Sequence, residues 1–212
     1  MKLNFHLMLF QFSLNYSFKW DRRNVKNYPT QGSYFDFKLF KDGLGILSDV
    51  NSFYLTSHLK KFWQLSDNIY FASSVKTKFT VKDAPYYLLN GFAFGNDLVR
   101  GYELYVVNGD NYGLAKLQLR YSLLKNKVFN VRAIQFEKFN KIPLNIYLGA
   151  YFDAGYAELK NDVQNNSLSN TTLYGGGVSL DFVSYYDLVV RVEYSINRLN
   201  EKGLFLHFIA PI

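Results

Sequence analysis

The chain has 212 residues, enough for one large domain or two small ones, and it contains no cysteine, which excludes a disulfide framework and a thiolate metal site. The formal net charge of +7 raises the question of a nucleic-acid partner, but the lysines and arginines are spread singly and no nucleic-acid-binding motif is present. No run of about 18 apolar residues occurs, which excludes a transmembrane helix.

The first segment, at about 3–20, predicts a long strand whose apolar phase shifts near Leu9 and Phe10, as a β-bulge would shift it. Its start is not a convincing signal peptide, because Asn4 and His6 interrupt the apolar run and no small-residue cleavage site follows. A membrane protein built from strands must be exported, so we expect the chain to be a piece of a longer protein.

Most later segments alternate apolar and polar residues with a period of two. In 187–197 every second residue from Leu188 to Ile196 is apolar, whereas Arg191 and Glu193 lie between them. The aromatic content of 19% also favours strands. The fold class is therefore predicted as all-β and antiparallel, with about nine strands. They are expected at 3–20, 32–41, 50–61, 68–80, 112–124, 143–156, 172–183, 187–197 and 203–209.

Apolar and aromatic faces on nearly every strand, with connections that alternate in length, are typical of a transmembrane β-barrel. A soluble β-sandwich would explain the alternation but not these faces. The connections at 21–32, 63–68 and 183–187 are predicted on the periplasmic side, and those at 41–49, 81–111, 159–171 and 198–202 on the external side. The 125–142 connection is longer than this pattern needs. Because open sheet edges cannot face lipid, an odd number of strands indicates part of a larger barrel.

Three short motifs occur in order along the chain. They are Val99-Arg100-Gly101-Tyr102, Phe152-Asp153-Ala154-Gly155 and the terminal Gly203-Leu204-Phe205-Leu206-His207-Phe208. Strand parity places Phe152 on the outer face and Asp153 on the inner face. In the last motif Leu204, Leu206 and Phe208 share one face, which suits an edge strand that pairs with another exposed edge.

Together these motifs resemble the VRG(F/Y) motif, the FxDxG motif and the terminal β-signal of the BamA/TamA superfamily of outer-membrane assembly factors, the bacterial surface antigen barrels. Residues 21–32 are similar to the turn that precedes the family's ninth strand. The resemblance implies that residues 1–212 form the carboxy-terminal part of one transmembrane β-barrel domain of about sixteen strands. The family's signal peptide, POTRA repeats and first barrel strands are not found in this sequence.

The resemblance also implies what the chain does. The barrel would lie in the bacterial outer membrane, contact outer-membrane lipids, and help to insert or translocate nascent outer-membrane proteins. Accessory lipoproteins of an assembly complex would be further partners. Val99, Arg100, Gly101 and Tyr102 would form a loop tip inside the lumen, with Arg100 reaching Asp153 in the Phe152-to-Gly155 motif. The edge at 203–209 would form one side of a lateral gate.

Other readings remain open. The barrel could anchor a patatin-like phospholipase, whose GxSxG elbow would lie upstream, or it could be a passive pore. No paired carboxylates or nucleophile elbow stand out, so we expect no enzyme and no cofactor. His6, His58 and His207 are expected on separate strands without metal-ligand spacing, so no metal site is predicted. Gly175, Gly176 and Gly177 either thin the wall near the loop or, more simply, relieve crowding and permit curvature.

Overall fold

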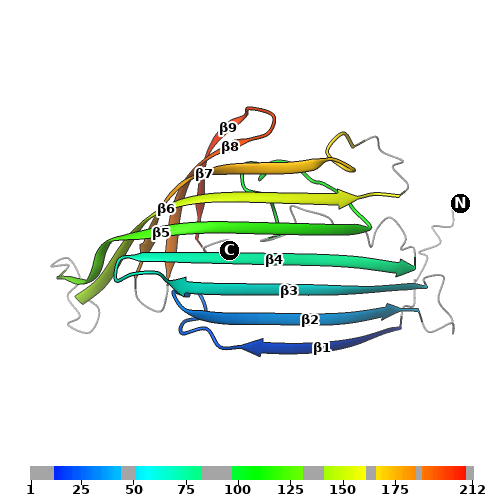
Figure 1. Cartoon of the computed structure of the whole chain (residues 1–212), viewed down its shortest axis with the longest axis horizontal. Coiled ribbons are helices and arrows are strands. Elements are labelled where there is room, and N and C mark those ends of the chain that lie inside the picture. The colour runs from blue at the N-terminus through cyan, green and yellow to red at the C-terminus, as the bar shows by residue number, and fades with distance from the viewer. Residues whose placement is uncertain are drawn as a thin grey trace, which may run out of the picture.

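The computed structural model describes residues 12–43, 51–82, 97–130, 141–160, 166–184 and 188–208. They form one antiparallel sheet of nine strands whose spatial order is the chain order, from β1 at one edge to β9 at the other (Figure 1). The strands are β1 (Ser13–Asp21), β2 (Gly32–Asp42), β3 (Ser52–Gln64), β4 (Ile69–Lys82), β5 (Asn111–Asn130), β6 (Lys141–Glu158), β7 (Thr172–Val183), β8 (Val189–Asn197) and β9 (Lys202–His207). Within these ranges, no helix has the length and apolar character to cross a membrane.

The all-β antiparallel fold predicted from the sequence is confirmed, and each expected strand has its counterpart. The first strand is described only from Ser13, so the bulge expected near Leu9 lies outside the described residues. β5 and β6 are longer than the expected 112–124 and 143–156.

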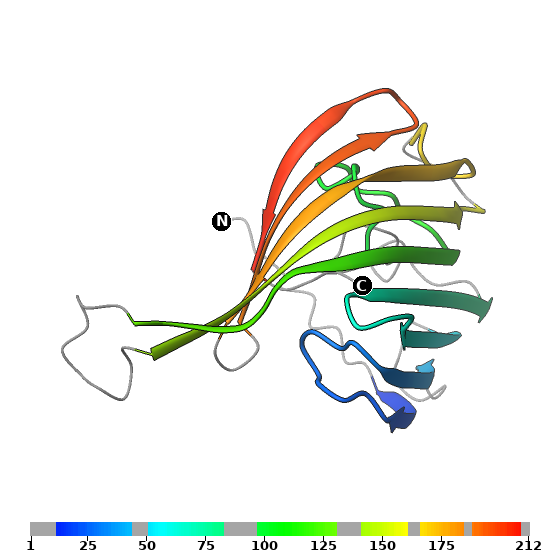
Figure 2. The ribbon, with the colours of Figure 1, turned by 60° about the vertical axis from the view of Figure 1, so that its left-hand side comes forward.

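The sequence pattern did not predict the full length of β5, because its pairing with β6 is irregular. The register between β5 and β6 shifts between Ser122 and Leu124 and again between Leu124 and Lys127. Asn126 has a positive φ of 47°, and its N–H donates to Asn145 Oδ1 at 2.7 Å. Each shift breaks the period-two pattern, so the alternation of apolar and polar residues ends before the strand does. β5 and β6 extend beyond the ends of their neighbours β4 and β7, and there they pair only with each other as a two-stranded ribbon (Figure 2).

The two faces of the sheet differ in chemistry, as strand parity predicts. On β6, Leu148 and Phe152 are exposed on the outer face, whereas Tyr147, Tyr151 and Asp153 are buried on the other. This arrangement of an apolar exterior and a polar interior is that of a barrel wall whose outer face meets lipid.

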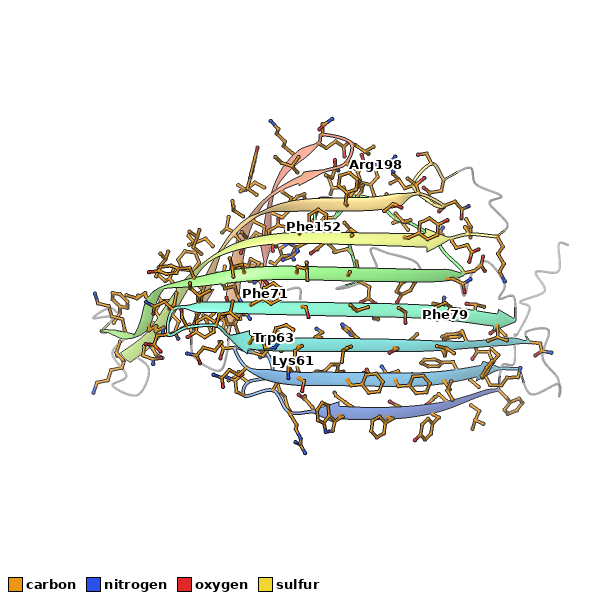
Figure 3. All side chains as sticks on the ribbon, in the orientation of Figure 1. Lys61, Trp63, Phe71, Phe79, Phe152 and Arg198 are labelled. Atoms are coloured by element: carbon orange, nitrogen blue, oxygen red, sulfur yellow. The ribbon has the colours of Figure 1, made fainter. Side chains whose placement is uncertain are left out.

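Aromatic side chains lie toward both ends of the outer face. Trp63 of β3 stacks on Phe71 of β4, with ring centroids 5.4 Å apart, near the short turn that joins these strands. Phe79 lies toward the opposite end of β4 (Figure 3). Aromatic rings at both ends of an apolar band are typical of the two membrane interfaces.

The sheet is curved, and two connections fold back onto its concave side. Residues 97–110, the described part of the β4–β5 connection, lie behind β6 and β7 (green in Figure 2). They contribute to an apolar cluster of Val99, Tyr102, Val107, Tyr112, Leu114, Ala157, Leu168 and Leu173. The turn at 22–31 between β1 and β2 contributes Tyr28 to a second cluster, with Tyr70, Tyr147, Val183 and Val189. Each end of the concave wall is thus covered by a segment that is distant in sequence.

Candidate functional site

Arg100 forms the centre of the contacts between the 97–110 segment and the wall. Its Nε donates to Asp153 Oδ2 at 2.8 Å and its second terminal nitrogen donates to Asp153 Oδ1 at 2.6 Å. The backbone N–H of Arg100 adds a third bond, to Asp153 Oδ2 at 3.2 Å. Both side chains are fully buried. A bidentate guanidinium–carboxylate pair of this kind fixes both position and orientation, which a lysine cannot do.

Glycines bring the loop backbone close to the wall. An added Cβ at Gly175 of β7 would overlap the carbonyl oxygen of Arg100, so only glycine fits there. Gly101 has a positive φ of 93°, which a residue with a side chain rarely adopts. Its carbonyl accepts a 2.8 Å hydrogen bond from the Asn197 amide of β8. Of the two readings for the glycine run, the close approach of the loop gives Gly175 a definite role.

Aromatic side chains hold the guanidinium from the wall side. The Arg100 guanidinium carbon lies 3.8 Å from the centroid of the Tyr151 ring, within cation–π range. The Tyr151 hydroxyl is in turn 2.5 Å from Ser195 Oγ on β8. An added Cβ at Gly177 would lie too close to the Tyr151 hydroxyl, so the absence of a side chain at Gly177 leaves room for the Tyr151 ring beside Arg100.

A second buried ion pair lies on the same wall. Arg191 of β8 donates twice to Asp181 of β7, from Nε to Oδ1 and from a terminal nitrogen to Oδ2, both at 2.6 Å. The Tyr28 hydroxyl, from the 22–31 turn, donates to Asp181 Oδ2 at 2.6 Å. Burial raises the pKa of the Tyr28 hydroxyl far above its ordinary value, so it remains a donor. Arg120 also holds the turn, because it donates to the Pro29 carbonyl at 2.7 Å.

Glu193 of β8 connects the two pairs. Its Oε1 lies 3.5 Å from a terminal nitrogen of Arg100 and 3.4 Å from one of Arg191. Contacts between charged groups therefore run without interruption from the loop through Arg100, Glu193 and Arg191 to Asp181 and the 22–31 turn. We call the buried side chains of this series the ionic chain; they are Arg100, Asp153, Glu193, Arg191 and Asp181.

The other motif residues take different places. Val99 and Tyr102 are buried in the apolar cluster, and Gly155 is buried between Leu114 and Leu173 in the sheet. Phe152 points outward and is 51% exposed, so it belongs to the outer apolar face and not to the ionic chain.

The terminal motif forms an edge. Among the described strands β9 pairs only with β8, so its other side is available to a further strand. Leu204, Leu206 and Phe208 are exposed on the outer face. Gly203 faces inward beside the Phe205 ring, which an added Cβ would overlap.

Sequence reasoning missed Glu103, Glu193, the Arg191–Asp181 pair and Tyr28. The alternation did place Arg191 and Glu193 on the polar face, but parity does not say which polar residues meet across strands. Tyr28 was expected in an ordinary turn, and no local signal shows that this turn folds inward. His58 and His207 do lie on separate strands, yet His207 Nε2 is 3.2 Å from Glu193 Oε2, a proximity that spacing within the sequence does not reveal.

The fold and the site define a class of protein: a transmembrane β-barrel wall with a long connection held on its inner face by a buried arginine. Residues 8–184 match the model of the Omp85 superfamily domain. This chain belongs to the Omp85 superfamily, the family of the BamA/TamA-type proteins, whose barrels insert or translocate outer-membrane proteins. No curated protein matches the chain.

Proposed function

We propose that this chain is the carboxy-terminal part of a barrel that inserts nascent outer-membrane proteins into the bacterial outer membrane, without covalent chemistry. The observation that carries the proposal is the buried bidentate bond between Arg100 and Asp153, which holds the 97–110 segment against the wall. Docking fixes β6, β7 and β8 around the loop, while β9, among the described strands, pairs only with β8.

The outer edge of β9 would supply the means of insertion. Backbone groups along this edge would pair with an incoming strand, and main-chain hydrogen bonds give such strand addition its affinity. Leu204, Leu206 and Phe208 keep this edge at the lipid face. The rigid wall behind it would present the edge in one geometry to each client strand.

The two alternatives make different use of the wall. A passive pore needs an open lumen, whereas here the 97–110 segment and the 22–31 turn both cover the concave side. A phospholipase anchor would use the barrel only as a membrane attachment, and the loop contacts would then be needed for stability but not for insertion.

The test is client folding into liposomes that contain the native protein, purified from its outer membrane. The client is an unfolded eight-stranded barrel, and folding is followed by its changed mobility in unheated gels. We expect the native protein to accelerate folding over empty liposomes and Arg100→Ala to lose most of this effect. Arg22→Ala, which removes an exposed arginine, is the matched control and should behave like the native protein.

Equal client folding rates with and without the native protein would contradict the proposal. Release of fatty acids from the same liposomes would favour the phospholipase anchor. Rapid loss of a trapped dye, unaffected by the client, would favour the pore.

A further inference from the structure

A second cluster of polar side chains lies beside the ionic chain, toward β9. It consists of Glu103 from the loop, Glu193 from β8 and His207 from β9. One ligand atom from each residue lies within 4.8 Å of the other two. The three residues come from separate segments, so the cluster forms only when the loop is docked.

Each residue has one buried atom that points into the cluster without a hydrogen-bond partner among the described residues: Glu103 Oε1, Glu193 Oε2 and His207 Nε2. Glu193 is fully buried. An unpartnered carboxylate oxygen in such a place is costly unless something binds it. This observation is independent of the clustering itself and points to a ligand.

The remaining oxygens of the two carboxylates are held from behind. The N–H of Gly101 donates to Glu103 Oε2 at 2.8 Å. Glu193 Oε1 faces the guanidinium groups of Arg100 and Arg191. Outer partners of this kind orient metal ligands in known sites. Each carboxylate therefore presents one fixed, free oxygen to the cluster.

The charges of the region favour a cation. Asp153 balances Arg100 and Asp181 balances Arg191, each through two bonds. Glu103 and Glu193 remain as two neighbouring carboxylates, and the buried Lys116 of β5, which also interacts with Asp153 and Glu193, offsets only one of their two charges. The 3.2 Å contact between His207 Nε2 and Glu193 Oε2 lacks hydrogen-bond geometry, so both atoms are available to a bound cation.

We propose that Glu103, Glu193 and His207 bind a divalent transition-metal ion of the zinc type, with a fourth position open to water. One imidazole nitrogen and two carboxylate oxygens suit zinc, whereas calcium and magnesium prefer oxygen ligands throughout. Two ligands of a tetrahedral zinc ion, each about 2.05 Å from it, lie about 3.3 Å apart. The His207–Glu193 separation of 3.2 Å matches this value.

The ion would act as a clamp. Because Glu103 belongs to the loop and His207 to the last strand, one bound metal ties the 97–110 segment directly to the edge strand. Arg100 ties the same segment to β6, so the two tethers hold different parts of the wall. Metal binding by these three residues would not require that the barrel insert client proteins.

The first test is zinc binding by the native protein in detergent, after treatment with EDTA and dialysis. Zinc chloride alone is titrated, and bound metal is counted by mass spectrometry after equilibrium dialysis. We expect one ion per chain, with affinity reduced at least about tenfold in Glu103→Gln and in His207→Ala. His58→Ala removes another partly buried histidine outside the cluster and should bind as the native protein does.

Absence of stoichiometric binding, or binding that both cluster variants retain, would overturn the proposal. Folding of each variant is checked by its mobility in unheated gels. Glu103→Gln changes a connection and no strand, so it keeps the test valid if His207→Ala fails to fold.

The second test measures whether zinc holds the 97–110 segment in place. Leu104 is 89% exposed at the loop surface, so chymotrypsin cleavage there reports loosening of the segment. We expect zinc to slow cleavage in the native protein and to have no effect in Glu103→Gln. Equal protection by zinc in both proteins would overturn the clamp.

Discussion

At the scale of single residues, the pair of Arg100 and Asp153 dominates because neither charge has any exposed surface. We expect Arg100→Ala and Asp153→Ala each to lower the free energy of unfolding by about 3–5 kcal/mol, since each leaves a buried charge without its partner. The double variant should lose less than the sum of the two, because it leaves neither member of the pair buried without the other. Urea unfolding in detergent measures this cycle, and strictly additive losses would contradict a direct pair.

Gly175 tests the close approach of the loop. Gly175→Ala places a methyl group where the Arg100 carbonyl oxygen lies, so the loop must move away from β7. We expect faster chymotrypsin cleavage at Leu104 in this variant. Gly113→Ala is the matched control, because an added Cβ there has no atom within 4 Å. If both variants are cleaved as slowly as the native protein, the loop backbone at Arg100 does not lie in close contact with Gly175.

Individual residues also show how far sequence reasoning reaches. Strand parity predicted that Asp153 points inward and Phe152 outward, and the structure shows both orientations. The meeting of Arg100 with Asp153 was expected only from family resemblance, because 53 residues separate them. Glu103 was not expected at all, since its partners come from strands about 90 or more residues further along the chain, and no local pattern records such a contact.

At the scale of elements, strands were predictable and the path of their connections was not. The alternation of apolar and polar residues located every strand, but it did not predict where β5 ends, because two register shifts interrupt the period. The 22–31 turn carries ordinary turn residues, and only tertiary contacts bring Tyr28 to Asp181, 153 residues away.

The inward turn makes its own prediction. Tyr28→Phe removes the hydrogen bond to Asp181 while it keeps the ring in its apolar cluster. Because a hydrogen bond to a charged group contributes about 1.5–3 kcal/mol, we expect a loss of that size in the free energy of unfolding. Tyr16→Phe, on the exposed outer face of β1, is the control and should change little. A Tyr28→Phe variant as stable as this control would show that the turn is not held by Asp181.

At the scale of the whole molecule, the ionic chain joins structures at opposite ends of the wall. The loop reaches it through Arg100, and the turn on the other side of the membrane reaches it through Tyr28. β6, β7 and β8 carry its central members, Asp153, Asp181, Arg191 and Glu193. These strands therefore form the part of the described wall that the ionic chain connects, next to β9.

The docked loop is tested most directly by amide hydrogen exchange in lipid nanodiscs. The N–H groups of Tyr102 and Tyr105 donate to the Val99 and Tyr102 carbonyls within the loop, so they are protected only while the segment keeps its structure. We expect slow exchange at both amides in the native protein and fast exchange in Arg100→Ala, with the amides of β5 to β8 unchanged in both. Fast exchange at Tyr102 and Tyr105 in the native protein would contradict a loop held on the wall by Arg100.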